Sequence, residues 1–434
     1  MSFIAQASVD KDLFDLHSSQ TSAFPFLLES VAGHPRSGRF DLLLGRPEQV
    51  IQAGDPFAAL DAAARSTPPI PPHPLLPFLG GWLVFLGYEA ARWVEPSVVF
   101  HPRPVGHADA WLARCCNAVL RDRRLGQVYA VSEHSLADAE ALLAAALAAP
   151  AAQLQAPRMD TLAAEPPERY LDGVLRVHDY LMAGDVFQVN LSRAWQGRLA
   201  DGANAMTVYA ALRQHNPAPF AASLHGPGPA VISSSPERLL SLDASGAQTR
   251  PIAGTRPRGI TDAEDALARA SLAASLKERA EHIMLIDLER NDLGRVCQPG
   301  SVSVDELMAI ESYAHVHHIV SNVRGRLRDG VGPGAALRAV FPGGTITGCP
   351  KVRCMEIIGE LESGPRGAYT GSVGYLSRCG RFDSNILIRS LEITGRDLRF
   401  RVGAGIVADS TPEHELAETD AKARGLLRAL QVGL

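Results

Sequence analysis

Short apolar runs separated by turn residues fill the first 150 residues of the chain. Residues 26–30 and 39–44 predict strands, and residues 82–86, which follow two glycines, predict a third. The Ala- and Leu-rich stretch 135–149 predicts a helix that begins at a serine. Residues 150–167 are rich in Ala, Gln and Pro without a clear period, so we expect a linker there.

Beyond this linker, helical and strand periods follow one another without strict alternation. Helical spacing predicts helices over residues 170–184, 262–288 and 352–361 and from about residue 410 onward. Alternating or continuous apolar positions predict strands over residues 186–192, 316–323, 372–376 and 386–393. This order favours a layered α+β fold over a doubly wound parallel sheet. No G-x-G-x-x-G or Walker A loop is present, so nucleotide binding of those kinds has no support.

The composition is typical of a soluble chain with ample material for a core. Its 434 residues allow two or three domains or one large one, and 46% of them are hydrophobic. A net charge of −5 offers no basic field for nucleic acid or for an anionic membrane. The six cysteines form no C-x-x-C pair, and neither a secretion signal nor an apolar stretch of about 18 residues is present. We therefore expect a reduced, cytoplasmic protein that binds neither nucleic acid nor membranes.

Two predicted helices carry pairs of carboxylates. Glu415, Glu418 and Lys422 lie on one face of the last helix, and Glu278 and Glu281 lie three residues apart on the long central one. A solvated charged stripe is the plain interpretation. Two carboxylate pairs that met in space would suit Mg²⁺, which prefers oxygen ligands. Spacing along the sequence cannot bring the two helices together.

Other segments are ambiguous when only their residues are considered. The glycine-rich segment 341–351 leads into a helix and ends in Lys351, so it predicts either an anion site or a plain tight turn. His317 and His318 face opposite ways if they lie in a strand, so at most one of them faces a cleft. A single histidine in a strand is usually structural.

Several segments considered together resemble the chorismate-utilising enzymes, and the resemblance covers nearly the whole chain. The segments are residues 184–192, 235–237, 250–256, 281–292, 316–321, 341–351 and 418–422. The chain is most similar to the aminodeoxychorismate synthase component I branch. The resemblance implies a chorismate-binding fold, a large layered α/β sandwich of mostly antiparallel sheets with helices packed outside. It also implies an anthranilate-synthase-like region over residues 1–155 and a chorismate-binding catalytic domain over residues 156–434.

By this resemblance the substrate is chorismate and the cofactor is Mg²⁺. Glu281 and Glu418 match the family's metal ligands, with Glu278 and Glu415 as outer carboxylates that act through water. The ion would hold the ring carboxylate of chorismate and act as a Lewis acid as charge develops in the ring.

The resemblance also assigns groups that would grip the substrate. Arg389 and Tyr369 match the residues that bind the enolpyruvyl carboxylate, for which a guanidinium fork is well suited. Gly403 and Gly405 match the close backbone approach beside that carboxylate, and Lys422 adds a positive charge.

Further residues match groups around the ring of chorismate. Glu237 matches the family's general acid beside the departing hydroxyl, a role worth about 10²–10⁴-fold in rate. Thr255 and His318 would line the ring, and Gly254 precedes the threonine in the same motif. Gln188 stands where members that add water carry a lysine, which implies that ammonia is the nucleophile.

Two sets of residues bear on the product. Asn190, His317 and Gly344 resemble the enzymes that form 4-amino-4-deoxychorismate for 4-aminobenzoate and folate biosynthesis. In the well-known form of those enzymes, a lysine that attacks C2 stands at the position of Ala253. Anthranilate synthase has alanine at this position, as this chain does. The expected product is 4-amino-4-deoxychorismate, with anthranilate and released pyruvate as the alternative.

The resemblance also concerns partners and regulation. No cysteine lies on the elbow that a class I glutaminase needs, so a separate glutamine amidotransferase subunit is expected to supply ammonia in a heterodimer. A candidate tryptophan pocket matches Ser30, Arg39, Phe40, Pro217 and Pro219, and a packing motif explains the same residues equally well. A non-catalytic relative that binds chorismate or tryptophan is a further alternative, which the intact catalytic set argues against.

Overall fold

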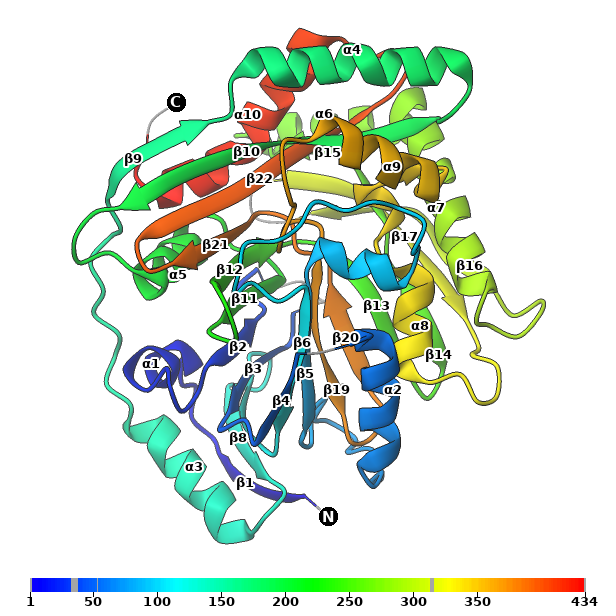
Figure 1. Cartoon of the computed structure of the whole chain (residues 1–434). Helices are drawn as coiled ribbons and strands as arrows, with labels where there is room; N and C mark the ends of the chain where they lie inside the picture. Colours follow the sequence, from blue (N-terminus) through cyan, green and yellow to red (C-terminus); the bar gives the residue numbers. More distant parts are fainter. Residues whose placement is uncertain (1, 33–37, 53, 313–315, 433–434) are drawn as a thin grey trace.

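Two large antiparallel sheets form the centre of the molecule, and helices cover them from outside (Figure 1). The computed structural model describes residues 2–32, 38–52, 54–312 and 316–432. This arrangement confirms the predicted α+β sandwich. Strands whose alternate residues are apolar bury one face between the layers, and the helices bury the other.

The first sheet runs from the N-terminal strand to the centre of the catalytic region. In spatial order it contains β1 (Phe3–Ala7), β8 (Gln127–Ser132), β7 (Asn117–Asp122), β3 (Phe40–Gly45), β2 (Phe26–Glu29), β11 (Phe220–Leu224), β12 (Ala230–Ser235), β21 (Ser390–Thr394), β22 (Asp397–Ile406), β10 (Gln188–Leu199) and β18 (Gly348–Cys349), with β9 (Met159–Ala164) also paired to β10.

The second sheet has the same mixture of early and late strands. In spatial order it contains β15 (Ile252–Pro257), β17 (Val316–Gly325), β14 (Gly246–Thr249), β13 (Arg238–Asp243), β20 (Phe382–Asn385), β19 (Ser372–Ser377), β5 (Gly81–Leu86), β6 (Ala110–Cys115) and β4 (Gln49–Ile51), with β16 (Ser303–Ser312) also paired to β17.

The helices are distributed over the outer faces and the ends of the sheets. They are α1 (Leu13–Ser19), α2 (Pro56–Ser66), α3 (Leu136–Ala148), α4 (Pro167–Ala183), α5 (Ala205–His215), α6 (Asp262–Ala274), α7 (Leu276–Gly294), α8 (Pro333–Val340), α9 (Lys351–Leu361) and α10 (Pro412–Ala429), with short 3₁₀ helices η1 (Tyr88–Trp93) and η2 (Gly344–Ile346). For the site, α7 packs against β15 and β17, and α10 packs against β22.

The two predicted regions, residues 1–155 and 156–434, contribute strands to both sheets. In the first sheet β2 pairs with β11, and in the second β5 pairs with β19. One hydrophobic cluster contains side chains from both regions, for example Trp82 and Val189. Residue 155 therefore separates stretches of sequence that share sheets and core.

Three predicted elements differ from the observed ones. The expected linker contains β9, which pairs with β10 and extends the sheet. The helix expected over 262–288 is two helices, α6 and α7, because Ser275 leaves helical geometry and its hydroxyl accepts a hydrogen bond from Glu278 N. The strand expected over 386–393 begins only at Ser390, since Arg389 has a φ of +52°.

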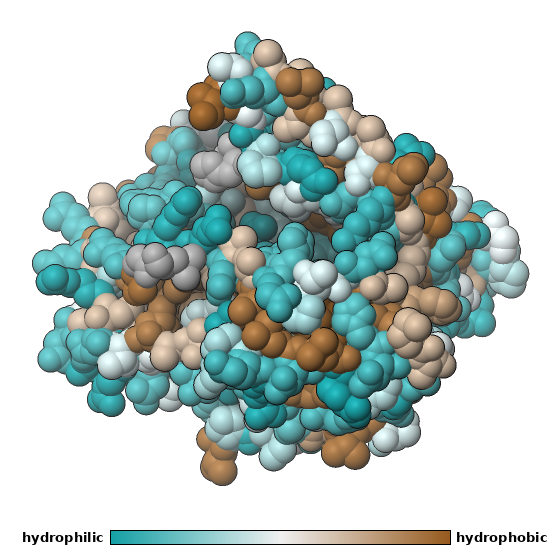
Figure 2. Space-filling model, turned by 90° about the horizontal axis from the view of Figure 1, so that it is seen from above, coloured by the Kyte–Doolittle hydropathy of each residue, from teal (hydrophilic) through white to brown (hydrophobic). Residues whose placement is uncertain are grey.

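The outer surface is mostly polar. Seen from above, teal residues cover much of this face and brown residues form separate groups among them (Figure 2). Within the described part of the chain, no helix is both long and apolar enough to cross a lipid bilayer.

Candidate active site

Glu237 lies where the chain passes from the first sheet to the second, between β12 and β13. Its side chain is buried, and its Oε1 has no hydrogen-bond partner among the described residues. Burial raises the pKa of Glu237 to about 7, although Thr345, the backbone of Ile252 and Arg389 oppose the shift. This carboxyl can therefore hold a proton near neutral pH and donate it.

Arg389 lies at a second crossing between the sheets, on the segment that joins β20 to β21. Its backbone has a φ of +52°, a conformation that few residues with side chains adopt and that marks a constrained position. Burial lowers the pKa of Arg389, and the charge of Glu237 opposes this. An arginine guanidinium keeps its proton in proteins, and that of Arg389 makes no hydrogen bond with the described residues, so it is available to an anionic ligand.

His318 and Thr255 meet across the paired strands β17 and β15. His318 Nδ1 lies 3.0 Å from Thr255 Oγ1 and 3.3 Å from the carbonyl oxygen of Gly254. Burial, helped by Arg389, lowers the pKa of His318 to about 4, so the imidazole is neutral at pH 7. The neighbouring His317 faces the other way, with Ser312 Oγ at 2.7 Å and Asp265 Oδ1 at 2.9 Å.

Gly254 forms an irregularity in β15 between Ala253 and Thr255. Its φ is +64°, and a Cβ there would lie only 2.9 Å from Glu278 Oε2. The glycine thus allows the strand to approach α7, which carries two of the predicted metal ligands. Ala253 is buried beside it.

Two glycines of β22 bring its backbone close to other predicted site residues. A Cβ at Gly403 would lie 2.7 Å from the Tyr369 hydroxyl, and a Cβ at Gly405 would overlap Gln188 Nε2. Gln188 Nε2 donates to Glu281 Oε1 at 2.9 Å, while Gln188 Oε1 has no partner among the described residues. These contacts place Tyr369, Gln188 and Glu281 along one side of β22.

The predicted metal ligands come from α7 and α10. Ligand atoms of His414, Glu415 and Glu418 lie within 4.8 Å of one another, and the buried Oε2 of Glu415 has no hydrogen-bond partner in the described chain. Glu278 and Glu281 lie outside this group, on α7. The orphaned oxygen and the four predicted carboxylates fit a hard divalent cation, and His414 places an imidazole beside those of α10.

Lysines connect the two carboxylate pairs electrostatically. Lys422 Nζ lies 2.7 Å from Glu418 Oε1 and donates to the carbonyl oxygen of Gly403 at 3.1 Å. Burial raises the pKa of Glu418, but Lys422, His414 and Lys277 outweigh it and hold the pKa below its usual value. Burial also raises the pKa of Glu281, where Lys422 and Lys277 again act in opposition. Both carboxylates therefore face the same two ammonium groups.

The glycine-rich segment that ends in Lys351 presents no free ammonium. Lys351 Nζ pairs with Asp292 Oδ2 at 2.6 Å, and both side chains are largely buried. Asn190 Nδ2 holds the same loop through the carbonyl oxygen of Ile346 at 3.0 Å. Gly344 packs against Leu288, where a Cβ would come within 3.2 Å. The segment therefore serves as a wall beside α7.

Three residues near the site were not predicted from the sequence. Thr345 opposes the rise in the pKa of Glu237. A ring nitrogen of His414 lies within 4.8 Å of carboxylate oxygens of Glu415 and Glu418 on α10. Glu289 is buried on α7, and burial raises its pKa to about 8, with Asp292 and Glu237 adding to the shift. Only His414 has a sequence signal, because it lies between the two glutamates of a Glu-His-Glu run.

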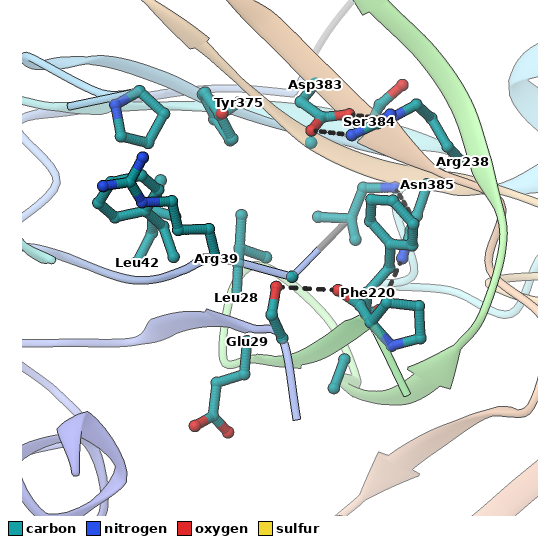
Figure 3. A pocket seen from close by; sticks show the side chains of 18 of the residues that line it. Leu28, Glu29, Arg39, Leu42, Phe220, Arg238, Tyr375, Asp383, Ser384 and Asn385 are labelled. Atoms are coloured by element: carbon teal, nitrogen blue, oxygen red, sulfur yellow. Dashed lines mark hydrogen bonds and ion pairs between the residues drawn. The ribbon is translucent and has the colours of Figure 1, made fainter. Parts of the chain in front are cut away.

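A cavity of about 360 Å³ lies apart from this site, between β2 of the first sheet and β19 and β20 of the second (Figure 3). Ser30, Arg39, Phe40 and Pro219 line it, as the resemblance implies, whereas Pro217 is not among its described lining residues. The Glu29 carboxylate turns away from the cavity, toward Tyr209 and Arg213.

Ion pairs occupy most charged groups around the cavity. Arg39 Nη2 lies 2.8 Å from Asp122 Oδ2, and Arg238 Nε lies 2.8 Å from Asp383 Oδ1. Ser30 Oγ donates to the carbonyl oxygen of Pro219 at 3.1 Å. The lining is thus a connected polar framework around apolar side chains.

Comparison with known proteins identifies the family. A family model described as chorismate binding enzyme matches residues 27–428. The chain belongs to this family. Chorismate binding enzymes similar to it include an anthranilate synthase component I-like protein of Synechocystis, 42% identical over 92% of this chain and 82% of that protein. Aminodeoxychorismate synthase component 1 of Bacillus subtilis is 39% identical over 89% of this chain and 84% of that protein.

Solved structures agree with this assignment. Anthranilate synthase component I of Streptococcus pneumoniae is 30% identical and has a TM-score of 0.80, covering 91% of this chain and 93% of that one. The menaquinone-specific isochorismate synthase MenF of Escherichia coli is 20% identical with a TM-score of 0.79 over 99% and 95% of the two chains, and shares the fold. The relatives of this chorismate binding enzyme therefore include proteins named as anthranilate synthase components and one named as an aminodeoxychorismate synthase component.

Proposed function

We propose that this enzyme aminates chorismate with ammonia to 4-amino-4-deoxychorismate, as an aminodeoxychorismate synthase component I. The observation that carries the choice of ammonia is Gln188. Its amide donates to Glu281 at 2.9 Å, and an amide has no basic lone pair with which to deprotonate water. Ammonia needs no such base, because the unprotonated molecule carries a free lone pair and can attack directly.

The choice of the 4-amino product rests on three positions. Asn190, His317 and Gly344 resemble the enzymes that make this product, and each has a defined place. Asn190 holds the loop at Ile346, and Gly344 packs on α7. His317 anchors β17 to Asp265 of α6. All three support the walls of the site, and Asn190 Nδ2 also donates to the Tyr369 hydroxyl at 3.4 Å, so they bear on the shape of the site.

Mg²⁺ fits the proposed site. Glu281 and Glu418 would hold it, with Glu278 and Glu415 acting through water, and when bound the ion would stabilise negative charge on the ring carboxylate. Lys277 and Lys422 both act to lower the pKa of Glu281 and of Glu418, which supports a common site for these two carboxylates. In the absence of the ion Lys422 partly neutralises Glu281 and Glu418, while Arg256 Nη1 lies 3.1 Å from Glu278 Oε1.

The remaining side chains bind chorismate and move one proton. Arg389 binds the enolpyruvyl carboxylate, with the Tyr369 hydroxyl beside the backbone of Gly403. Neutral His318 and Thr255 contact the ring without adding charge. Glu237, which is partly protonated at neutral pH, donates its proton to the C4 hydroxyl as that group leaves.

Anthranilate synthase is the second candidate function, and Ala253 favours it. A lysine at this position would provide an amine for attack on C2, and alanine cannot. Ammonia would then have to attack C2 itself, giving a 2-amino intermediate. Addition of a second ammonia at C4 with loss of the first gives the 4-amino product, whereas elimination of pyruvate gives anthranilate.

The product formed from chorismate, Mg²⁺ and ammonium distinguishes the two functions. We expect 4-amino-4-deoxychorismate without release of pyruvate, identified by its mass together with an NMR spectrum that separates it from the 2-amino isomer of the same mass. Fluorescent anthranilate with stoichiometric pyruvate, and no 4-amino product, would contradict the proposal. With glutamine in place of ammonium, the pure chain should give no turnover, because the amidotransferase is a separate subunit.

A further inference from the structure

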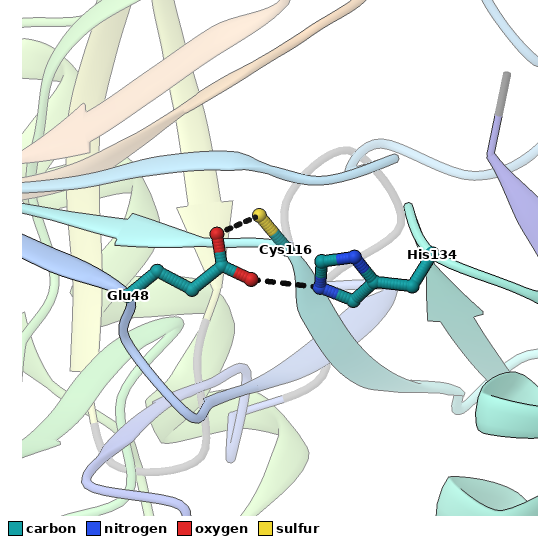
Figure 4. Close-up of side chains that lie close together, drawn as sticks. All are labelled: Glu48, Cys116 and His134. Atoms are coloured by element: carbon teal, nitrogen blue, oxygen red, sulfur yellow. Dashed lines mark hydrogen bonds and ion pairs between the residues drawn. The ribbon is translucent and has the colours of Figure 1, made fainter.

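Three side chains with different ligand atoms meet beside β7, which several strands of the first sheet separate from β22 and β10 (Figure 4). Cys116 Sγ donates to Glu48 Oε2 at 3.1 Å, and His134 Nε2 lies 2.7 Å from Glu48 Oε1. The sulfur, nitrogen and oxygen atoms all lie within 4.8 Å of one another. Neither the proposed reaction nor the cavity uses these residues.

Backbone hydrogen bonds fix the three residues in place. Glu48 N donates to the carbonyl oxygen of Arg114 at 2.9 Å, just before β4 pairs with β6. Cys116 lies between β6 of the second sheet and β7 of the first, and its carbonyl oxygen accepts from Glu133 N at 3.0 Å. His134 N donates to Ser132 Oγ at 3.2 Å, before α3 begins. The ligands therefore come from the point where the two sheets are joined.

The order of the contacts argues against a nucleophilic cysteine. In a catalytic Cys-His-Glu arrangement, the imidazole lies between the thiol and the carboxylate so that it can take the thiol proton. Here Glu48 lies between Cys116 and His134, and the imidazole hydrogen-bonds to the carboxylate and not to the thiol. Cys116 is also only 3% exposed, which leaves little room for a substrate.

We propose that Glu48, Cys116 and His134 bind Zn²⁺. A thiolate, an imidazole and a carboxylate are ligands of zinc, with bond lengths of about 2.0–2.3 Å. Tetrahedral ligands at those lengths lie about 3.5 Å apart, so the observed group needs only small movements to surround the ion. Zinc would displace the thiol proton, and water would complete the site.

The surroundings give the ion access. The side chains of His134 and Glu48 are 50% and 46% exposed, while the sulfur lies beneath them. The nearby guanidinium of Arg114 is already held by both oxygens of Glu133, at 2.6 and 2.7 Å. Because the sulfur ligand favours zinc over magnesium, this site and the carboxylates of α7 and α10 would select different ions.

Metal titration of the whole chain tests the site. The protein is loaded with saturating Mg²⁺ to occupy the carboxylates, and then titrated with Zn²⁺ and separately with Co²⁺. We expect one tightly bound zinc per chain and, with cobalt, the near-ultraviolet charge-transfer band of a thiolate ligand. Zinc should also raise the melting temperature, because it binds the folded state and joins the two sheets.

Two pairs of variants make the result specific. Loss of a residue that only hydrogen-bonds to a metal ligand typically weakens metal binding about 10–100-fold. His134 and Cys116 are proposed as ligands themselves, so His134→Ala and Cys116→Ser should weaken zinc binding by at least about 100-fold. Cys116→Ser should also abolish the cobalt band. His134→Ala changes an exposed side chain and keeps the test valid if Cys116→Ser fails to fold. The matched controls are the exposed His215→Ala and the half-buried Cys379→Ser, which should bind like the wild type.

Equal zinc affinity of wild type and His134→Ala, or no charge-transfer band in the cobalt-loaded wild type, would overturn the proposal. The same holds if His215→Ala and Cys379→Ser weaken binding as much as the two ligand variants do.

Discussion

The proposed active site and the N-terminal cavity differ in how their polar groups are satisfied. In the active site, Glu237 Oε1, Gln188 Oε1 and Glu415 Oε2 are buried and have no hydrogen-bond partner within the described chain. Around the cavity, Arg39 pairs with Asp122 and Ser30 with the carbonyl oxygen of Pro219. No described residue of the cavity lining has a buried side-chain oxygen or nitrogen without a partner.

The proposed active site therefore has polar atoms that a charged ligand could bind, whereas the polar groups around the N-terminal cavity are paired with one another. A buried polar atom without a partner costs about 1–3 kcal/mol. Such atoms also occur elsewhere in the described chain, but in the proposed site three of them gather on residues assigned to ligand binding or proton transfer, where a ligand can supply the missing bonds. The active site is therefore expected to gain stability from its ligands and to lose activity steeply on substitution. The cavity is expected to respond mainly through stability.

The largest effect is expected at the metal ligands. Glu281→Gln or Glu418→Gln removes one of two charges that would hold Mg²⁺, whose contribution is several kcal/mol. Turnover of chorismate with ammonium should fall by at least about 10²–10³-fold, with an unchanged circular dichroism spectrum. Glu413→Gln is the matched control, because Glu413 is exposed on the first turn of α10, the helix that carries Glu418. This variant should keep wild-type turnover. Full activity of Glu281→Gln in the presence of a chelator would remove the metal from the proposal.

A loss of similar size is expected at Glu237, together with a gain in stability. Glu237→Gln cannot donate a proton, so kcat should fall by about 10²–10⁴-fold. In the wild type, kcat should decrease as the pH rises above about 7, where this carboxyl loses its proton. A pH profile that is flat from pH 6 to pH 9, as measured by initial rates, would assign the proton to another group.

The same raised pKa has a consequence for folding. The pKa of Glu237 rises from 4.5 to about 7 on folding, so the folded state binds the proton more tightly than the unfolded state does. Stability from this group is therefore present below pH 4.5 and is lost as the pH rises through about 7. At pH 8, Glu237→Gln should raise the free energy of unfolding by about 1–3 kcal/mol, measured by denaturant titration.

The sequence predicts the fold class well because its signals are local. Apolar runs and glycines mark β2, β5 and β17, and Gly184 ends α4 with a φ of +78°. The motif resemblance also identifies glutamates on the two helices. That Glu281 and Glu418 lie under the influence of the same two lysines depends on the packing of α7 on β15 and α10 on β22, which no spacing rule contains.

The errors occur where local and tertiary signals compete. Ser275 and Glu278 form a helix-start pattern, but the apolar period continues across it and favours one long helix. The stretch 386–393 is apolar enough for a strand, yet Arg389 takes a positive φ because the chain must cross between sheets there. Residues 159–164 have no strong strand pattern and pair only because β10 offers an open edge.

A moderate effect is expected where the backbone of β22 touches the site. Gly405→Ala adds a methyl group that overlaps Gln188 Nε2 and must displace the amide that donates to Glu281. Because a shift of about 1 Å in a site can cost about 100-fold, kcat/KM should fall about 10–100-fold. Gly364→Ala, with no atom within 4 Å of the added carbon, is the matched control. Equal kcat/KM for both variants would show that this contact does not shape the site.

The smallest effect is expected in the N-terminal cavity. Ser30→Ala removes the hydroxyl that donates to the carbonyl oxygen of Pro219 at 3.1 Å, and with it a link between β2 and the loop before β11. One buried hydrogen bond is worth about 0.5–1.5 kcal/mol, so the free energy of unfolding should fall by that amount. Turnover with ammonium should stay within about twofold of the wild type, because Ser30 contacts none of the groups that bind chorismate. If tryptophan occupies the cavity, it should raise the melting temperature of the wild type more than that of Ser30→Ala. A tenfold loss of kcat in Ser30→Ala would show instead that the N-terminal cavity and the active site are coupled. The cavity would then not be a framework whose polar groups affect stability alone.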